Sequence, residues 1–192
     1  MLELARIVRK TNGVTPYIFD MKSEVLRHYL NAFPRLGLNE SLRVNLIYHL
    51  LGKPLLLRIE RKDKVSQAIS YHVSRETGIY HVWDDGQGQE ARYDFEKIRK
   101  YYDQYRQDSV AFDARINLIR SRTTRVYYED LCKDLEGQIE SVSESLYLPL
   151  VNRNFDMSIE VKTTLQDVKE DFRRKFLSDM KTRFGVMEEC SL

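Results

Sequence analysis

Residues 61–70, which read RKDKVSQAIS, combine the residue types best suited to binding an anion. Arg61 opens the segment and Ser70 closes it. A guanidinium presents several donors in one plane, and a hydroxyl adds another, so the pair suits a phosphate group. Asp63 is a preferred helix N-cap, and the apolar residues after it recur at helical spacing. We therefore expect a helix that begins after Asp63, with Ser70 in its polar stripe.

The residues before this turn predict a strand. Residues 55–59 read LLLRI, a short apolar run after Gly52 and Pro54 that is typical of a buried strand. In open α/β sheets ligands bind beyond the carboxyl ends of the strands, and a helix N-terminus favours an anion. The pattern thus predicts a site where Arg61 and Ser70 meet over one phosphate. The simpler alternative is that the polar stripe is only the solvated face of an amphipathic helix.

Three short strands, each followed by a helix, predict an α/β fold with parallel strands. The other two strands are expected at 17–21 and 125–128. Apolar periodicity and capping residues predict helices at 2–9, 24–33, from Asn39 or Ser41 to 51, and at 63–78, 94–119, 129–146 and about 164–184. We expect Glu129 and Asp130 to cap the helix that follows the third strand. No inter-domain linker is evident, so residues 1–192 are interpreted as one domain.

The composition narrows the class of protein. The formal net charge is only +2, which argues against a dedicated nucleic-acid binder. No apolar run approaches a membrane span, and the first residues do not form a signal peptide. The two cysteines and four histidines show no metal-ligand spacing. We therefore expect a cytoplasmic protein with reduced thiols, no metal, no nucleic-acid partner and no membrane contact.

The segment 61–70 resembles the second cofactor motif of sulfotransferases of the bacterial trehalose 2-sulfotransferase type, which reads R-[RK]-D-K-V-x-Q-A-x-S. Ser66 stands where this motif usually has Ala. The resemblance extends over roughly residues 12–180. It includes a short strand ending in Lys at 17–22, an aromatic-rich loop at 78–81, a Y-E-D-L segment at 125–131, and Gln166-Asp167.

This resemblance implies a fold similar to that of P-loop kinases and other P-loop NTPases, with a parallel sheet flanked by helices. Such enzymes move a sulfuryl group from 3′-phosphoadenosine 5′-phosphosulfate (PAPS) to a hydroxyl, without a metal, here on a carbohydrate or other small metabolite. Arg61 and Ser70 would bind the 3′-phosphate of PAPS. Lys22 is a candidate for contact with substrate or a sulfuryl oxygen, and His81 for the border of the acceptor pocket. The simpler alternatives are a solvated Lys22 and, beside His81, a Trp83 that only anchors the loop.

The chain also departs from the family pattern. It has no R-[ST]-G-[ST] turn, which cradles the 5′-phosphosulfate, and Thr163-Thr164 stand where the family often has Arg. The resemblance then implies a sheet incomplete at the N-terminus and a missing general base, so we expect little or no turnover by this chain alone. Exposed sheet edges predict a homo-oligomer or a completing chain. Two alternatives remain: a non-catalytic nucleotide-binding or interaction module that retains the 3′-phosphate half-site, and a structural domain that binds no nucleotide.

Overall fold

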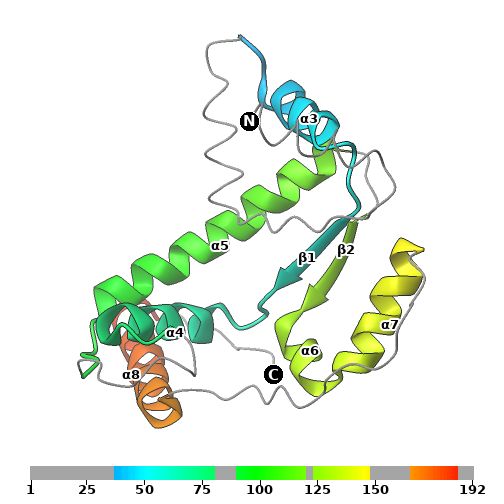
Figure 1. The fold of residues 1–192 in the computed structure, drawn as a ribbon. Helices are drawn as coiled ribbons and strands as arrows, with labels where there is room; N and C mark the ends of the chain where they lie inside the picture. Colours follow the sequence, from blue (N-terminus) through cyan, green and yellow to red (C-terminus); the bar gives the residue numbers. More distant parts are fainter. Residues whose placement is uncertain (1–36, 81–89, 120–122, 148–164, 186–192) are drawn as a thin grey trace.

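The computed structural model describes residues 37–80, 90–119, 123–147 and 165–185 (Figure 1). The helices predicted at 2–9 and 24–33 and the strand predicted at 17–21 lie outside these ranges. Lys22 and His81 also lie outside them.

Two parallel strands form the described sheet. Strand β1 (Leu56–Glu60) pairs with β2 (Thr123–Tyr127), and the register runs from Leu56 opposite Thr123 to Glu60 opposite Tyr127. Both strands point the same way in Figure 1, so their carboxyl ends meet at one edge. The predicted parallel α/β arrangement is confirmed for these two strands.

Three predicted helices begin at the predicted caps. Helix α3 (Glu40–Leu50) begins at Asn39, whose side chain accepts a hydrogen bond from the N–H of Leu42 at 2.9 Å. Helix α4 (Lys64–Thr77) begins at Asp63 and ends at Gly78, which has a φ of 74° that glycine adopts without strain. Helix α5 (Phe95–Leu118) begins at Asp94, which accepts a hydrogen bond from the N–H of Lys97. These local capping signals decided where the helices start.

The chain after β2 forms two helices, so the prediction of one helix over 129–146 was wrong. Helix α6 (Tyr128–Lys133) ends at Asp134, and α7 (Leu135–Leu146) begins there. Asp134 leaves the helical conformation, with a φ of −151° and a ψ of 80°, and its side chain accepts a hydrogen bond from the N–H of Gly137. Asp is more favourable at an N-cap than inside a helix, which explains the break.

A helical core packs α4 and α5 against α8 (Gln166–Phe184), as Figure 1 shows. The spacing of residues after Asp63 predicted one face of α4 that packs on the core. All residues of that face are buried: Val65, Ala68, Ile69, His72 and Val73. They meet buried aromatic residues of the other two helices, including Phe95, Tyr102, Phe172 and Phe176. This core holds α8 against α4.

Strand β1 is not buried on both faces, contrary to the prediction. Its buried residue is Arg58, which faces α5, whereas Leu57 is 49% exposed and Ile59 is 60% exposed. Alternate residues of a strand point to opposite faces, so Leu57 and Ile59 lie on the face away from α5. None of the described helices is both long and apolar enough to cross a membrane.

Candidate anion-binding site

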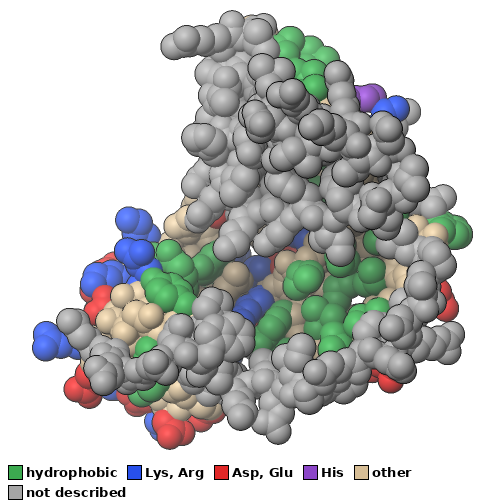
Figure 2. Space-filling model, in the orientation of Figure 1, with side chains coloured by type: hydrophobic (Ala, Val, Ile, Leu, Met, Phe, Trp, Pro, Cys, Tyr) green, Lys and Arg blue, Asp and Glu red, His purple; other side chains and the backbone are tan. Residues whose placement is uncertain are grey.

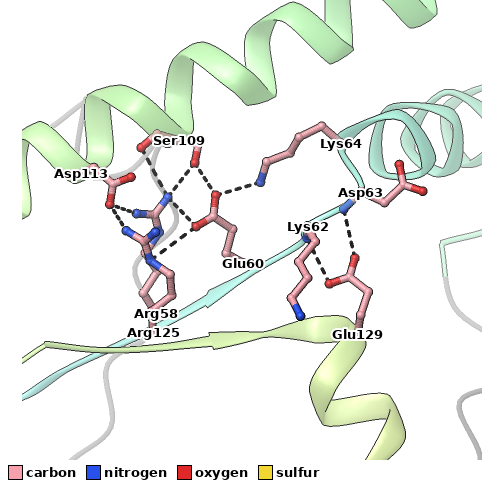
Figure 3. A network of polar contacts seen from close by, with 9 residues as sticks. All are labelled: Arg58, Glu60, Lys62, Asp63, Lys64, Ser109, Asp113, Arg125 and Glu129. Atoms are coloured by element: carbon pink, nitrogen blue, oxygen red, sulfur yellow. Dashed lines mark hydrogen bonds and ion pairs between the residues drawn. The ribbon is translucent and has the colours of Figure 1, made fainter. Parts of the chain in front are cut away.

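A network of charged residues fixes the carboxyl end of β1 to the neighbouring elements (Figure 3). Arg58 forms ion pairs with Asp113 of α5 and with Glu60, the latter at 3.0 Å, and its Nη2 donates to Ser109 Oγ at 2.8 Å. Arg125 of β2 also pairs with Asp113. A buried arginine requires such partners, because an uncompensated buried charge is strongly destabilising.

Glu60 connects this network to the start of α4. Its Oε1 accepts hydrogen bonds from Lys64 Nζ at 2.9 Å and from the hydroxyl of Ser109. Burial alone would raise the pKa of Glu60, but the hydrogen bonds from Ser109 and Lys64 and the charge of Arg58 outweigh it. The pKa of Glu60 therefore lies below its ordinary value, and the carboxylate stays ionised.

The turn between β1 and α4 is held by Glu129 of α6. Its carboxylate accepts hydrogen bonds from the N–H of Lys62 at 3.0 Å and from the N–H of Asp63 at 3.3 Å. Asp130 pairs with Lys62 Nζ at 2.8 Å. Helix α6 has no side-chain cap, so the prediction that Glu129 and Asp130 cap it was wrong. Both residues instead contact a turn that is remote in sequence.

The backbone at the start of α4 therefore differs from the expected open anion site. Glu129 occupies the amides of Lys62 and Asp63, and the N–H of Ser66 donates to Asp63 Oδ1 at 2.9 Å. The amides of Lys62, Asp63 and Ser66 are therefore not available to an anion at this edge of the sheet. Figure 2 shows basic and hydrophobic side chains together in the hollow at the centre of this face.

Arg61 is the best-placed side chain for that purpose. Its guanidinium carbon lies 4.2 Å from the centroid of the Tyr128 ring, a cation–π contact that fixes the plane of the guanidinium. Within the described ranges no carboxylate pairs with Arg61. Burial and a hydrogen bond with Cys132 raise the pKa of Tyr128, so the ring stays neutral beneath the cation.

Ser70 lies on α4, partly buried, one helical turn after Ser66 and on the same side. A rise of 1.5 Å per residue places it about 10 Å along the axis from Asp63. No hydrogen bond joins Ser70 to Arg61 in the described part of the chain. The structure thus places the two predicted residues at the ends of one segment without bringing them into contact.

Lys169 of α8 was not selected from the sequence, yet it lies near enough to Arg61 to be affected by its charge. Burial lowers the pKa of Lys169, and the positive charge of Arg61 lowers it further. Among the described residues, no carboxylate pairs with Lys169. Its only signal in the sequence is its place shortly after Gln166-Asp167, because its position relative to Arg61 depends on how α8 packs against α4.

Arg173, one turn further along α8, fixes this helix to the start of α4. Its Nη1 donates to Asp63 Oδ2 at 2.8 Å and to Ser66 Oγ at 3.1 Å. The Ser66 hydroxyl in turn donates to Asp63 Oδ2 at 2.8 Å, which gives a role to the serine that replaces the usual alanine. Burial would raise the pKa of Asp63, but the hydrogen bonds from Ser66 and the charge of Arg173 lower it overall.

The sequence of this chain was compared with models of known protein families. The model of the Stf0 sulphotransferase family matches residues 17–179. The chain belongs to the Stf0 sulphotransferase family. The match covers both strands, the turn at Arg61 and the first part of α8 in this Stf0 chain. No curated protein and no solved structure is similar enough to be matched with it. Within the described residues of the Stf0 chain, no group of three or more metal-ligating side chains occurs.

Proposed function

We propose that this Stf0 family member binds PAPS and transfers its sulfuryl group to a hydroxyl of a carbohydrate or other small metabolite. The observation that carries the proposal is Arg61, which is fixed over Tyr128 at the carboxyl edge of a parallel sheet and has no carboxylate partner among the described residues. PAPS, when bound, supplies the sulfuryl group and leaves as adenosine 3′,5′-bisphosphate. Membership of a sulphotransferase family supports this choice of ligand.

The chemistry of the side chains fits the 3′-phosphate of this cofactor. The positive charge of Arg61 helps to lower the pKa of Lys169, and a phosphate dianion between the two cations would relieve that repulsion. Hydrogen bonds from a guanidinium to a phosphate are charge-assisted and strong. In this proposal Arg61 binds the 3′-phosphate, Tyr128 holds the guanidinium plane, and Ser70 donates a further hydrogen bond.

The residues that act on the sulfuryl group are proposed from the resemblance alone. Lys22 would contact the substrate or a sulfuryl oxygen, and His81 would border the acceptor pocket. Both belong, in this proposal, to a single sulfotransferase-like α/β domain. Substitution of either residue is expected to reduce turnover and leave the binding of adenosine 3′,5′-bisphosphate unchanged.

Isothermal titration with adenosine 3′,5′-bisphosphate tests the cofactor site. Arg61→Ala is expected to weaken binding by about 1.5–3 kcal/mol, as for a hydrogen bond to a charged group. Arg75→Ala is the matched control, because Arg75 is an exposed arginine in the last turn of α4. Equal affinities of the two variants would contradict the assignment of Arg61.

Turnover is tested separately with labelled PAPS and a panel of carbohydrate acceptors that includes trehalose. The absence of an R-[ST]-G-[ST] turn from the sequence predicts little or no transfer of label by this chain alone. Transfer of label to an acceptor would contradict that expectation and would rule out the alternative of a non-catalytic nucleotide-binding module.

We also propose that this protein forms a homo-oligomer. The apolar residues Leu57 and Ile59 of β1 are 49% and 60% exposed, and a second copy of the chain could cover them. Sedimentation velocity is expected to show a dimer that Ile59→Lys dissociates. A wild-type monomer would contradict this proposal and leave the cofactor site unaffected.

A further inference from the structure

Lys169 lies on the face of α8 that meets the start of α4. It precedes Arg173 by four residues, so the two side chains project from the same side of α8, about 5.4 Å apart along its axis. Arg173 contacts Asp63 and Ser66 at the first turn of α4. Lys169 is thereby directed toward the turn before α4, where Arg61 lies.

The environment of Lys169 differs from that of the other described lysines. Only Lys64 and Lys169 are partly buried; the rest are exposed. Lys64 has a carboxylate partner, Glu60, at 2.9 Å. Lys169 has no carboxylate partner among the described residues and faces a second cation, Arg61. A partly buried cation beside another cation is unfavourable unless an anion joins them.

The nearby carboxylates are already committed to other groups. Asp63 binds Arg173 and the start of α4, Glu129 binds the amides of the turn, and Asp130 pairs with Lys62. Among the described residues, these neighbouring carboxylates are therefore not available to neutralise Arg61 and Lys169, and a bound anion would do so. Two positive charges favour a dianion, such as a phosphate monoester, over a singly charged group.

We propose that Lys169 is a binding residue that α8 contributes to this site, where it contacts the same phosphate dianion as Arg61. The identity of that dianion as the 3′-phosphate of a nucleotide rests on the proposed function. In this proposal two elements contribute residues to the site: the turn after β1 contributes Arg61, and α8 contributes Lys169. Arg173 positions α8 by its hydrogen bond to Asp63.

A ligand-binding role predicts opposite effects of Lys169→Met on stability and on affinity. Removing a cation that is repelled by Arg61 should raise the melting temperature of the ligand-free protein. The same change should weaken the binding of adenosine 3′,5′-bisphosphate roughly 10- to 100-fold, as expected for a lost charged hydrogen bond. A lysine that only supports the fold would lower the melting temperature and leave the affinity unchanged.

The test compares Lys169→Met with Lys175→Met, which removes an exposed lysine from the same helix. Each protein is titrated with adenosine 3′,5′-bisphosphate and with adenosine 5′-monophosphate, which lacks the 3′-phosphate. We expect Lys169→Met to lose affinity for the bisphosphate alone, and Lys175→Met to bind like the wild type. Equal bisphosphate affinities of the two variants would overturn the inference, and so would a lower melting temperature of ligand-free Lys169→Met.

Inorganic phosphate separates this inference from the proposed function. If the wild-type protein binds neither nucleotide, the proposed function fails. In that case the role of Lys169 is tested by thermal unfolding with and without inorganic phosphate, because a ligand that binds only the folded state raises the melting temperature. A smaller phosphate-induced rise for Lys169→Met than for Lys175→Met would support the inference, and equal rises would overturn it.

Discussion

Arg173 donates a hydrogen bond from Nη1 to Oδ2 of Asp63 at 2.8 Å, across 110 residues of sequence. The same carboxylate accepts the N–H of Ser66 and so caps α4. One aspartate therefore both starts the helix of the cofactor motif and fixes α8 against it. For this reason α8 is fixed beside the start of α4, where the anion site is proposed, as well as being part of the core.

Arg173→Met should destabilise the protein by about 1–2 kcal/mol, because it leaves a partly buried Asp63 without its cation. Urea unfolding followed by circular dichroism measures the change. Arg174→Met is the control, since Arg174 is the next residue and is 79% exposed. Identical unfolding midpoints for the two variants would show that the Asp63 contact contributes nothing.

Glu129→Gln should loosen the turn that carries Arg61. A glutamine side chain can accept only through its oxygen, so one of the two amides of Lys62 and Asp63 loses its acceptor. We expect a loss of about 1 kcal/mol of stability and faster hydrogen exchange at these amides. Glu144→Gln, at an exposed position of α7, should do neither; unchanged exchange in Glu129→Gln would contradict the role of Glu129.

Arg58→Met should have a much larger effect on stability than substitution of a surface arginine. It removes the buried cation that joins Asp113 and Glu60, and since Arg125 and Lys64 still pair with these carboxylates, we expect a loss of about 1.5–3 kcal/mol. Arg115→Met breaks only the outer pair with Glu40, which is 51% exposed, and should cost less than about 1 kcal/mol. Similar losses in the two variants, measured by chemical denaturation, would mean that the network in Figure 3 is not a buried one.

Acid should destabilise the protein through Glu60 and Asp63. The pKa of each is lower in the folded state than the ordinary values of 4.5 and 3.8. The unfolded state therefore binds more protons at acidic pH. The contribution of these two carboxylates to the free energy of unfolding is fully present above their ordinary pKa values, and it is lost as the pH falls through their lowered folded-state pKa values. Asp63→Asn retains an N-cap and should flatten the loss of stability below about pH 4.

Urea titrations between pH 3 and pH 7 measure that slope. Asp167→Asn, an exposed residue in the first turn of α8, serves as the control and should keep the wild-type pH dependence. An Asp63→Asn curve parallel to that of the wild type would show that Asp63 has no part in the acid response.

Tyr128 should matter for nucleotide affinity through its ring and not through its hydroxyl. Tyr128→Phe keeps a surface for the guanidinium of Arg61 and should bind adenosine 3′,5′-bisphosphate like the wild type. Tyr128→Leu removes the cation–π contact and should weaken binding by about 0.5–2 kcal/mol. Calorimetric titration distinguishes the two, and equal affinities would argue against Tyr128 as the support for Arg61.

The sequence by itself determined the local elements of this protein. Helical periodicity together with Asp63 and Gly78 predicted both ends of α4, because capping is a short-range interaction between a side chain and nearby backbone. The motif at 61–70 also predicted that Arg61 binds an anion, and this stays a prediction. Local signals failed at Asp134, where a residue able to cap a new helix interrupted an apolar pattern that continued through it.

Only the tertiary structure decided what surrounds Arg61. Glu129 leaves its own helix uncapped and occupies the turn amides, since the carboxyl ends of parallel strands bring α6 beside that turn. The position of Lys169 relative to Arg61 depends on the buried face of α8, because Phe172 and Phe176 set the rotation of that helix against α4. Such contacts join residues more than 60 positions apart, and no spacing rule within one segment encodes them.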